Sequence, residues 1–159
     1  MKSFETSDAL QIHYQVRGNS DHPTLLLLHG LGADHQMWSA QLETFPNQGY
    51  HVVAPDLRGH GRSSRPKSFS LEDCARDVRE LLDHLGLDAA HVIGVSMGGL
   101  IAQRLACDAP ARVETLTLVD TFSSANQFPE RLYAWFATAL LTVLPKSTQS
   151  KIVVNGYER

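Results

Sequence analysis

The sequence has no long apolar run and no block of like charge. Its longest uncharged apolar stretch covers residues 132–145, which is shorter than the roughly 20 residues that a membrane-spanning helix needs. The 14 Lys and Arg and the 17 Asp and Glu are interspersed, with a formal net charge of −3 and without the basic patch typical of nucleic acid binding. Residues 1–15 lack the apolar core of a signal peptide. We therefore expect a cytoplasmic protein whose partner is neither a membrane nor a nucleic acid.

Cysteine is scarce, and motifs for metal or phosphate binding are missing. Cys74 and Cys107 fall in segments of helical pattern without Cys-x-x-Cys or Cys/His ligand spacing, so we expect both to be buried, reduced thiols. The turn-rich residues 56–63 contain two glycines and basic residues, but neither Gly-x-Gly-x-x-Gly nor the Gly-Lys-Ser/Thr ending of a phosphate loop. We interpret this stretch as a structural turn at the sheet edge, and we expect no metal and no cofactor.

The remaining pattern is that of an α/β domain. A chain of 159 residues, 43% of them hydrophobic, suffices for one globular core. Apolar periodicity predicts strands at residues 10–16, 24–30, 51–55, 91–95 and 113–119, and helices at residues 34–45, 71–85 and 97–108. Strands that alternate with helices indicate a mainly parallel sheet with helices on both faces. After residue 121 we expect a loop and a helix between Pro129 and Pro145, with no convincing strand.

The stretch HVIGVSMGG, residues 91–99, places Ser96 between a predicted strand and a predicted helix. Reactive groups collect beyond the carboxyl ends of parallel strands. A turn this sharp strains the serine backbone and leaves room only for very small residues two positions before and after it, where Gly94 and Gly98 stand. The pentapeptide Gly-x-Ser-x-Gly is common by itself, but this context indicates a nucleophile elbow.

A second glycine-rich turn, His29-Gly30-Leu31-Gly32, ends the predicted strand 24–30. We expect this strand to lie two strands away from the serine strand. The turn can aim the Leu31 N–H at the same oxygen as the Met97 N–H, and two such donors make an oxyanion hole. We interpret His29 as a residue that hydrogen-bonds its own loop and supports the turn, and not as the base. His60 as the base is the weaker alternative.

The stretches TLLLLHGLGADHQMW, VVAPDLRGHGRSS and GVSMGG, in this order, resemble the α/β-hydrolase superfamily, and within it the esterases, enol-lactonases and cofactor-free perhydrolases. The resemblance implies that Ser96 is the nucleophile and that the Leu31 and Met97 N–H groups form the oxyanion hole. It also implies a core domain over residues 1–121 and the start of a helical cap, incomplete, over residues 122–159, in which residues 132–144 would line an apolar acyl pocket. Dehalogenases and epoxide hydrolases of this fold carry Asp at the elbow, so Ser96 argues against both.

A general base for the serine is missing from the sequence. Nucleophilic serines need a histidine that a carboxylate orients, and in this fold the chain order is Ser, then Asp or Glu, then His. All eight histidines precede Ser96. We therefore expect a chain truncated within the cap, with the histidine in a missing C-terminal half. Asp120, after the last predicted strand, is a candidate acid, and a carboxylate that caps the following loop is an equal alternative.

Two functions remain open at this point. The first is a serine hydrolase that acts on a small-molecule ester, lactone or thioester through an acyl-serine intermediate, with little or no turnover by these 159 residues alone. The second is a non-catalytic chain that binds a small hydrophobic ligand or complements the other half of a split hydrolase. The absence of a histidine after Ser96 is the sequence feature that distinguishes these two functions, and it does so only in part.

Overall fold

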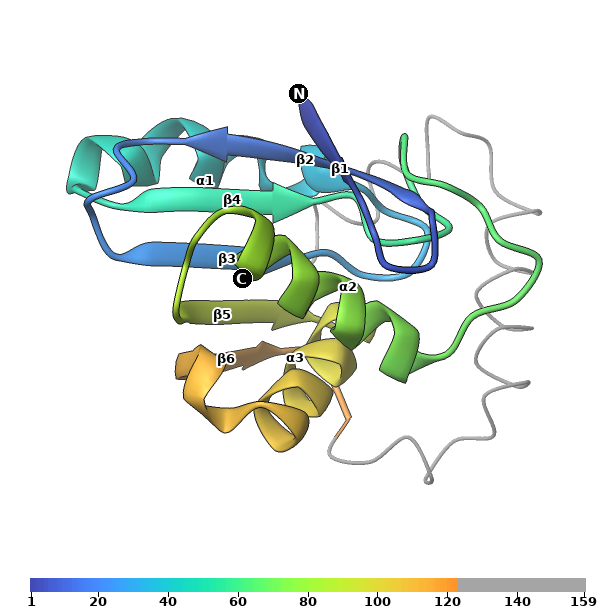
Figure 1. Ribbon diagram of the computed structural model, residues 1–159. Coiled ribbons are helices and arrows are strands. Elements are labelled where there is room, and N and C mark those ends of the chain that lie inside the picture. Colours follow the sequence, from blue (N-terminus) through green and yellow to red (C-terminus); the bar gives the residue numbers. More distant parts are fainter. Residues whose placement is uncertain (123–159) are drawn as a thin grey trace. The chain divides into compact units, whose positions relative to one another are not determined.

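A computed structural model describes residues 1–122, which form a six-stranded sheet with helices packed against it (Figure 1). The spatial order of the strands is β1-β2-β4-β3-β5-β6. The strands are β1 (Lys2–Glu5), β2 (Gln11–Arg17), β3 (Thr24–Leu28), β4 (His51–Pro55), β5 (Ala90–Val95) and β6 (Val113–Val119). The α-helices are α1 (Ser39–Thr44), α2 (Leu71–His84) and α3 (Met97–Asp108), and the 3₁₀ segments are η1 (His35–Trp38), η2 (Phe45–Gln48) and η3 (Pro110–Arg112).

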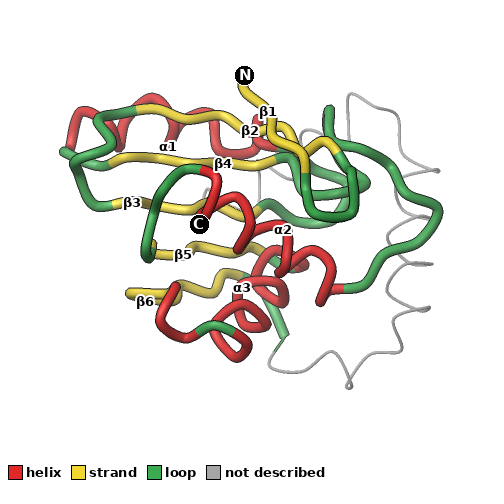
Figure 2. Tube along the Cα trace, in the orientation of Figure 1, coloured by secondary structure: helices red, strands yellow, loops and turns green. Residues whose placement is uncertain are grey.

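The sheet is mainly parallel, as the sequence predicts. Strands β4, β3, β5 and β6 pair in parallel, whereas β2 pairs antiparallel with both β1 and β4. Strand β3 lies directly beside β5, with Leu28 opposite Gly94, so the expectation that it lies two strands away from the serine strand is wrong. The chain leaves β4 on one side of β3 and crosses through α2 to the other side. The carboxyl ends of β3 and β5 therefore meet at one edge of the sheet (Figure 2).

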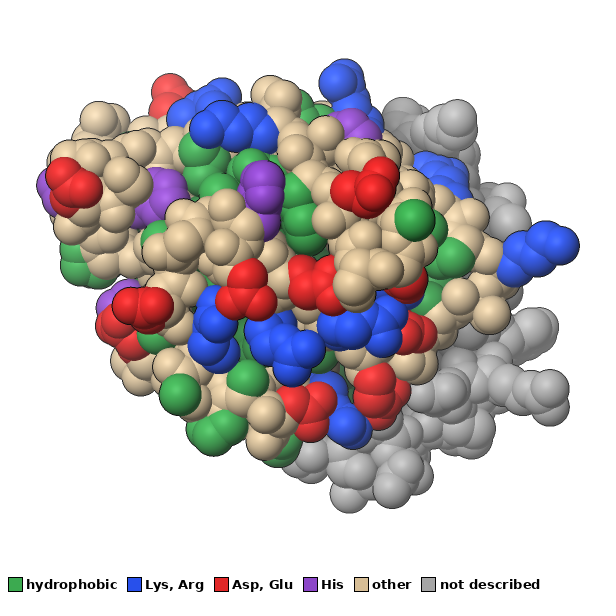
Figure 3. All heavy atoms as spheres, in the orientation of Figure 1, with side chains coloured by type: hydrophobic (Ala, Val, Ile, Leu, Met, Phe, Trp, Pro, Cys, Tyr) green, Lys and Arg blue, Asp and Glu red, His purple; other side chains and the backbone are tan. Residues whose placement is uncertain are grey.

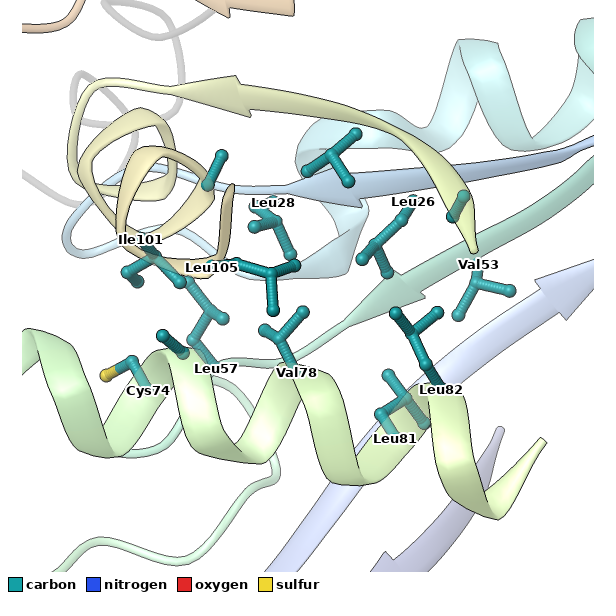
Figure 4. Close-up of a cluster of buried hydrophobic side chains, with 14 of the residues drawn as sticks. Leu26, Leu28, Val53, Leu57, Cys74, Val78, Leu81, Leu82, Ile101 and Leu105 are labelled. Atoms are coloured by element: carbon teal, nitrogen blue, oxygen red, sulfur yellow. The ribbon is translucent and has the colours of Figure 1, made fainter. Parts of the chain in front are cut away.

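Helical segments cover both faces of the sheet. In β3, all of whose residues are buried, Leu26 and Leu28 belong to a cluster with α2 and α3 (Figure 4). Leu25 and Leu27 belong to a second cluster, which Trp38 of η1 joins. Because successive side chains of a strand point to opposite faces, these two clusters lie on opposite sides of the sheet. Burial on both faces explains the continuous apolar run in the sequence.

The ends of the helices follow local sequence signals. Ser70 and Asp73 form a capping box at the start of α2, in which each side chain accepts a hydrogen bond from the other residue's backbone N–H. Gly86, with φ of 67°, follows the end of that helix, as predicted. The predicted helix 34–45 is instead three short segments, η1, α1 and η2. Pro46 stands in the first turn of η2, and Gly49, with φ of 84°, ends that segment.

Two further expectations need correction. Strand β1 was absent from the prediction because its single buried residue, Phe4, gives no alternating pattern. Cys74 is buried as expected, but Cys107 is exposed. Helix α3 buries Ile101 and Leu105, and Cys107, two positions beyond Leu105, points away from that stripe because each residue advances the helix by about 100°.

The cap expected over residues 122–159 lies outside the described residues, apart from Phe122. Its boundary and the apolar pocket expected over residues 132–144 therefore stay predictions. In residues 1–122, no helix is long and apolar enough to cross a membrane.

Ion pairs connect α2 to its neighbours. Arg58 lies before α2 and is 3% exposed, and it pairs with the equally buried Asp77 through two side-chain hydrogen bonds. Arg104 of α3 lies 2.8 Å from Glu72 of α2. Figure 3 shows basic and acidic side chains interleaved over these helices. This face consequently carries no extended patch of positive or of negative charge.

Candidate active site

Ser96 stands in a strained turn between β5 and α3. Its φ is 52° and its ψ is −115°, a region that non-glycine residues rarely occupy. The Ser96 N–H donates to the Val119 carbonyl at 3.0 Å. The Ser96 carbonyl accepts the N–H groups of Gly99 and Leu100 and, at 2.7 Å, the Thr121 hydroxyl. Bonds from β6, α3 and the loop after β6 thus hold the strained conformation.

The glycines around Ser96 are required by contacts with backbone atoms. A Cβ atom on Gly94 would lie 2.6 Å from the carbonyl carbon of Gly98. A Cβ atom on Gly98 would lie 2.7 Å from the carbonyl oxygen of His29. Real Cβ atoms essentially never approach other heavy atoms this closely. The spacing of two residues on each side of the serine therefore reflects close packing of β3, β5 and α3.

Sequence reasoning missed one more such contact. A Cβ atom on Gly99 would lie 2.6 Å from both the Cβ and the Oγ1 of Thr121. Thr121 also donates to the Ser96 carbonyl, so it supports the turn from the end of β6. The last glycine of the GVSMGG stretch was the only sequence signal for this contact.

The loop after β3 reaches the serine. A Cβ atom on Gly30 would lie 3.6 Å from the Ser96 Cβ and from the Val95 carbonyl oxygen. Leu31 follows directly, and Met97 is the first residue of α3. Neither the Leu31 N–H nor the Met97 N–H donates to a backbone or side-chain group of residues 1–122. The oxyanion hole expected from these two N–H groups stays a prediction.

His29 is fully buried and hydrogen-bonded to backbone at both ring nitrogens. The Leu57 N–H donates to Nε2 at 3.0 Å, so Nδ1 carries the proton and donates to the Gly30 carbonyl at 2.8 Å. Burial lowers the pKa of His29 to about 4. The ring therefore ties the loop after β3 to the loop after β4. These bonds are those expected of a residue that supports the turn.

The loop after β4 is organised around Asp56, which the sequence interpretation passed over. This fully buried carboxylate accepts the backbone N–H of His35 at 2.9 Å, the His35 Nδ1–H at 2.7 Å and the Arg62 N–H at 2.8 Å. Burial acts to raise the pKa of Asp56, but the hydrogen bonds from Arg62 and His35 hold it below its usual value. His60 in the same loop is buried, and its Nδ1–H donates to the Arg58 carbonyl at 3.0 Å. Residues 56–63 are therefore a hydrogen-bonded structural turn.

Asp120 lies at the carboxyl end of β6, one strand from the serine strand. It is exposed and has φ of 45°. Within residues 1–122 its carboxylate forms neither a hydrogen bond nor an ion pair. The two expected roles, catalytic acid and loop cap, both stay predictions.

The chain is similar in sequence to known proteins. The family model described as the alpha/beta hydrolase fold matches residues 23–149. The chain is 37% identical over 126 residues to a putative carbamate hydrolase, RutD, of Variovorax paradoxus, which covers 78% of this chain and 47% of that protein. It is 34% identical over 137 residues to 3-oxoadipate enol-lactonase 2 of Acinetobacter baylyi, covering 86% of this chain and 49% of the lactonase.

A solved structure of a hydrolase has a similar fold. The crystal structure of a hydrolase from Pseudomonas aeruginosa matches with a TM-score of 0.77 and 33% identity, over 97% of this chain and 64% of that one. The chain thus spans about half the length of the two sequence relatives.

Proposed function

The chain belongs to the α/β-hydrolase fold family, and from this premise we propose that it carries the nucleophile of a serine hydrolase for carboxylic esters, lactones or thioesters. The observation that carries the proposal is the Ser96 turn. A serine with φ of 52° between β5 and α3, packed between glycines that admit no side chain, lifts a hydroxyl clear of the sheet. Structural serines gain nothing from such strain.

In the proposed reaction a general base takes the proton of the Ser96 hydroxyl while the hydroxyl oxygen attacks the acyl carbon of the substrate. The negative charge moves to the carbonyl oxygen, where the Leu31 and Met97 N–H groups donate to it. Losing one such donor typically raises the barrier by about 2.7–4 kcal/mol. The C–O or C–S bond to the leaving group then breaks, and a protonated base gives its proton to that group. Water releases the acyl group from Ser96 by the same steps.

The base is proposed to come from the part of the whole protein that this chain does not include. The chain spans about half the length of its relatives, and both nitrogens of His29 already bind backbone groups. Asp120 is the candidate acid, because it directly follows β6, the strand next to β5. We also propose that the protein acts in the cytoplasm on a small acyl substrate.

The test is hydrolysis by the whole protein of p-nitrophenyl esters, lactones and acyl thioesters. We expect Ser96→Ala to lower kcat by at least about 10³-fold, while Ser20→Ala, at an exposed position, leaves kcat unchanged. Quenched reactions should contain the acyl group on the peptide of Ser96. Retained activity in Ser96→Ala would overturn the proposal. The substrate that is hydrolysed fastest shows whether the enzyme acts on esters, lactones or thioesters.

A second candidate function is that of a complementing half. Strand β6 ends the sheet and pairs only with β5 among the described strands. Its Leu116 is 37% exposed and its Leu118 is 42% exposed, which favours a partner polypeptide on this edge. Co-purification of the chain with a co-expressed polypeptide encoded beside it, and recovery of ester hydrolysis in the complex, would support this function.

A further inference from the structure

Three potential metal ligands gather on the side of the sheet that carries η1. Asp34 precedes η1, His35 begins it, and Asp56 follows β4. One ligand atom from each residue lies within 4.8 Å of the others. Asp56 is fully buried, whereas the His35 side chain is 12% exposed. Of these potential ligands, Asp56 is therefore part of the buried interior, whereas His35 is partly accessible to solvent.

The two carboxylates have little positive charge beside them. Within residues 1–122, neither Asp34 nor Asp56 pairs with a lysine or arginine side chain. The Asp34 carboxylate accepts the Gln36 N–H at 2.8 Å. His35 is the one ionisable donor that reaches Asp56. The buried Asp56 carboxylate is thus held by N–H donors of His35 and Arg62, without the lysine or arginine side chain that often accompanies a buried carboxylate.

A second observation comes from the neighbouring strand. The Asp56 N–H donates to the His13 carbonyl at 2.8 Å, which continues the pairing of Tyr14 with Pro55 by one residue. Opposed residues of antiparallel strands project their side chains from the same face, with Cβ atoms about 4.5–5.5 Å apart. The Nδ1 atom of His13 is buried and has no hydrogen-bond partner. A polar atom without a partner thus lies one strand away from the buried carboxylate.

We propose that Asp34, His35 and Asp56 bind a divalent transition metal ion such as Zn²⁺, with solvent completing its coordination. Imidazole and carboxylate together suit such ions. Adjacent ligands of a tetrahedral ion at bond lengths of about 2.0–2.1 Å lie about 3.3 Å apart, so His35 Nδ1 and Asp56 Oδ1, 2.7 Å apart, would separate by about 0.6 Å to admit the ion. The metal takes the place of the Nδ1 proton, which passes to solvent. The ion joins the loop after β3 to the loop after β4, and its binding is independent of the proposed function.

The test is calorimetric titration of the chelator-treated chain with Zn²⁺. We expect one saturable site, lost or weakened by more than about tenfold in His35→Gln and in Asp34→Asn. Asn is as good an N-cap as Asp, so the second variant removes the charge and keeps the start of η1. His22→Gln, at an exposed histidine, is the matched control and should bind like the natural chain.

Thermal unfolding gives a second readout. Zn²⁺ should raise the Tm of the natural chain and of His22→Gln, but not that of His35→Gln. Equal stoichiometry and affinity in His35→Gln and in the natural chain would overturn the proposal, because the ion would then sit on other histidines. The absence of any saturable site would overturn it as well.

Discussion

A Cβ atom placed on Gly98 would lie 2.6 Å from the carbonyl carbon of Leu28. Leu28 is the last residue of β3, and Gly98 lies in the first turn of α3. The helix that follows Ser96 therefore rests directly on the end of the neighbouring strand. This contact fixes where the serine turn stands relative to the loop that carries Leu31.

Substituting Gly98 tests this packing. We expect Gly98→Ala to lower the free energy of unfolding by about 2–4 kcal/mol, because the added methyl group overlaps backbone that cannot move aside. Gly86→Ala is the control, since Gly86 has φ of 67° and open space around it. Gly86→Ala should lower the free energy of unfolding only by the about 1–2 kcal/mol that a left-handed backbone costs a residue with a side chain. Urea denaturation measures both, and a smaller loss in Gly98→Ala than in Gly86→Ala would contradict the packing argument.

The buried pair of Arg58 and Asp77 allows a second test. Arg58→Met leaves the buried Asp77 carboxylate without its partner and should destabilise the chain by about 3–5 kcal/mol. Asp77→Leu should cost less, because Arg58 keeps its ion pair with Asp8 at 3.2 Å. The double variant should be much less destabilised than the sum of the two. Denaturant unfolding of all four proteins gives the coupling free energy. Additive losses would show that the two side chains act independently.

Burial of neutral His29 predicts a pH dependence of stability. Its folded pKa of about 4 lies below the ordinary 6.5, so the unfolded chain binds more protons between these values. Stability from this residue is complete above pH 6.5 and is lost as the pH falls towards 4, by up to about 1.4 kcal/mol per pH unit. His29→Ala should flatten the slope of unfolding free energy against pH in this window. The exposed His22→Ala should keep the natural slope, and an equal slope in all three proteins would argue against the buried neutral ring.

The open edge of β6 predicts self-association of the isolated chain. Exposed Leu116 and Leu118 stand on a strand with a single charged residue, Glu114, and charged side chains discourage pairing of strand edges. Replacing both leucines by lysine should shift the chain towards monomer in light scattering at a given concentration. Lysines at the exposed residues Ser20 and Asp21 provide the control. Unchanged scattering of the Leu116→Lys, Leu118→Lys variant would place the association elsewhere.

Much of the fold and the serine turn could be predicted because local signals coincide there. The apolar run of β3, the capping box of Ser70 and Asp73, and the glycines at 94 and 98 each specify their own backbone. Strand order does not follow from such signals, since the neighbours of β3 depend on where the crossover through α2 returns. The sequence therefore did not reveal that β3 lies beside β5.

Contacts between distant residues were likewise invisible in the sequence. The bond from Thr121 to the Ser96 carbonyl joins positions 25 residues apart, and His35 meets Asp56 across 21 residues. Neither pair has a spacing that a periodic pattern detects. Cys107 was misplaced for a related reason, because which side of α3 is buried depends on its packing against β5 and α2.

The most direct test of the central claim is the release of p-nitrophenolate by the 159-residue chain in excess p-nitrophenyl butyrate, with Ser96→Ala beside it. The account predicts no sustained release above that of Ser96→Ala, because the base is proposed to lie outside this chain, and it predicts that any butyryl group found in peptide mass spectra is on Ser96. Sustained release that depends on Ser96 would contradict the absence of a base in these residues, and butyrylation of another side chain in its place would contradict Ser96 as the nucleophile.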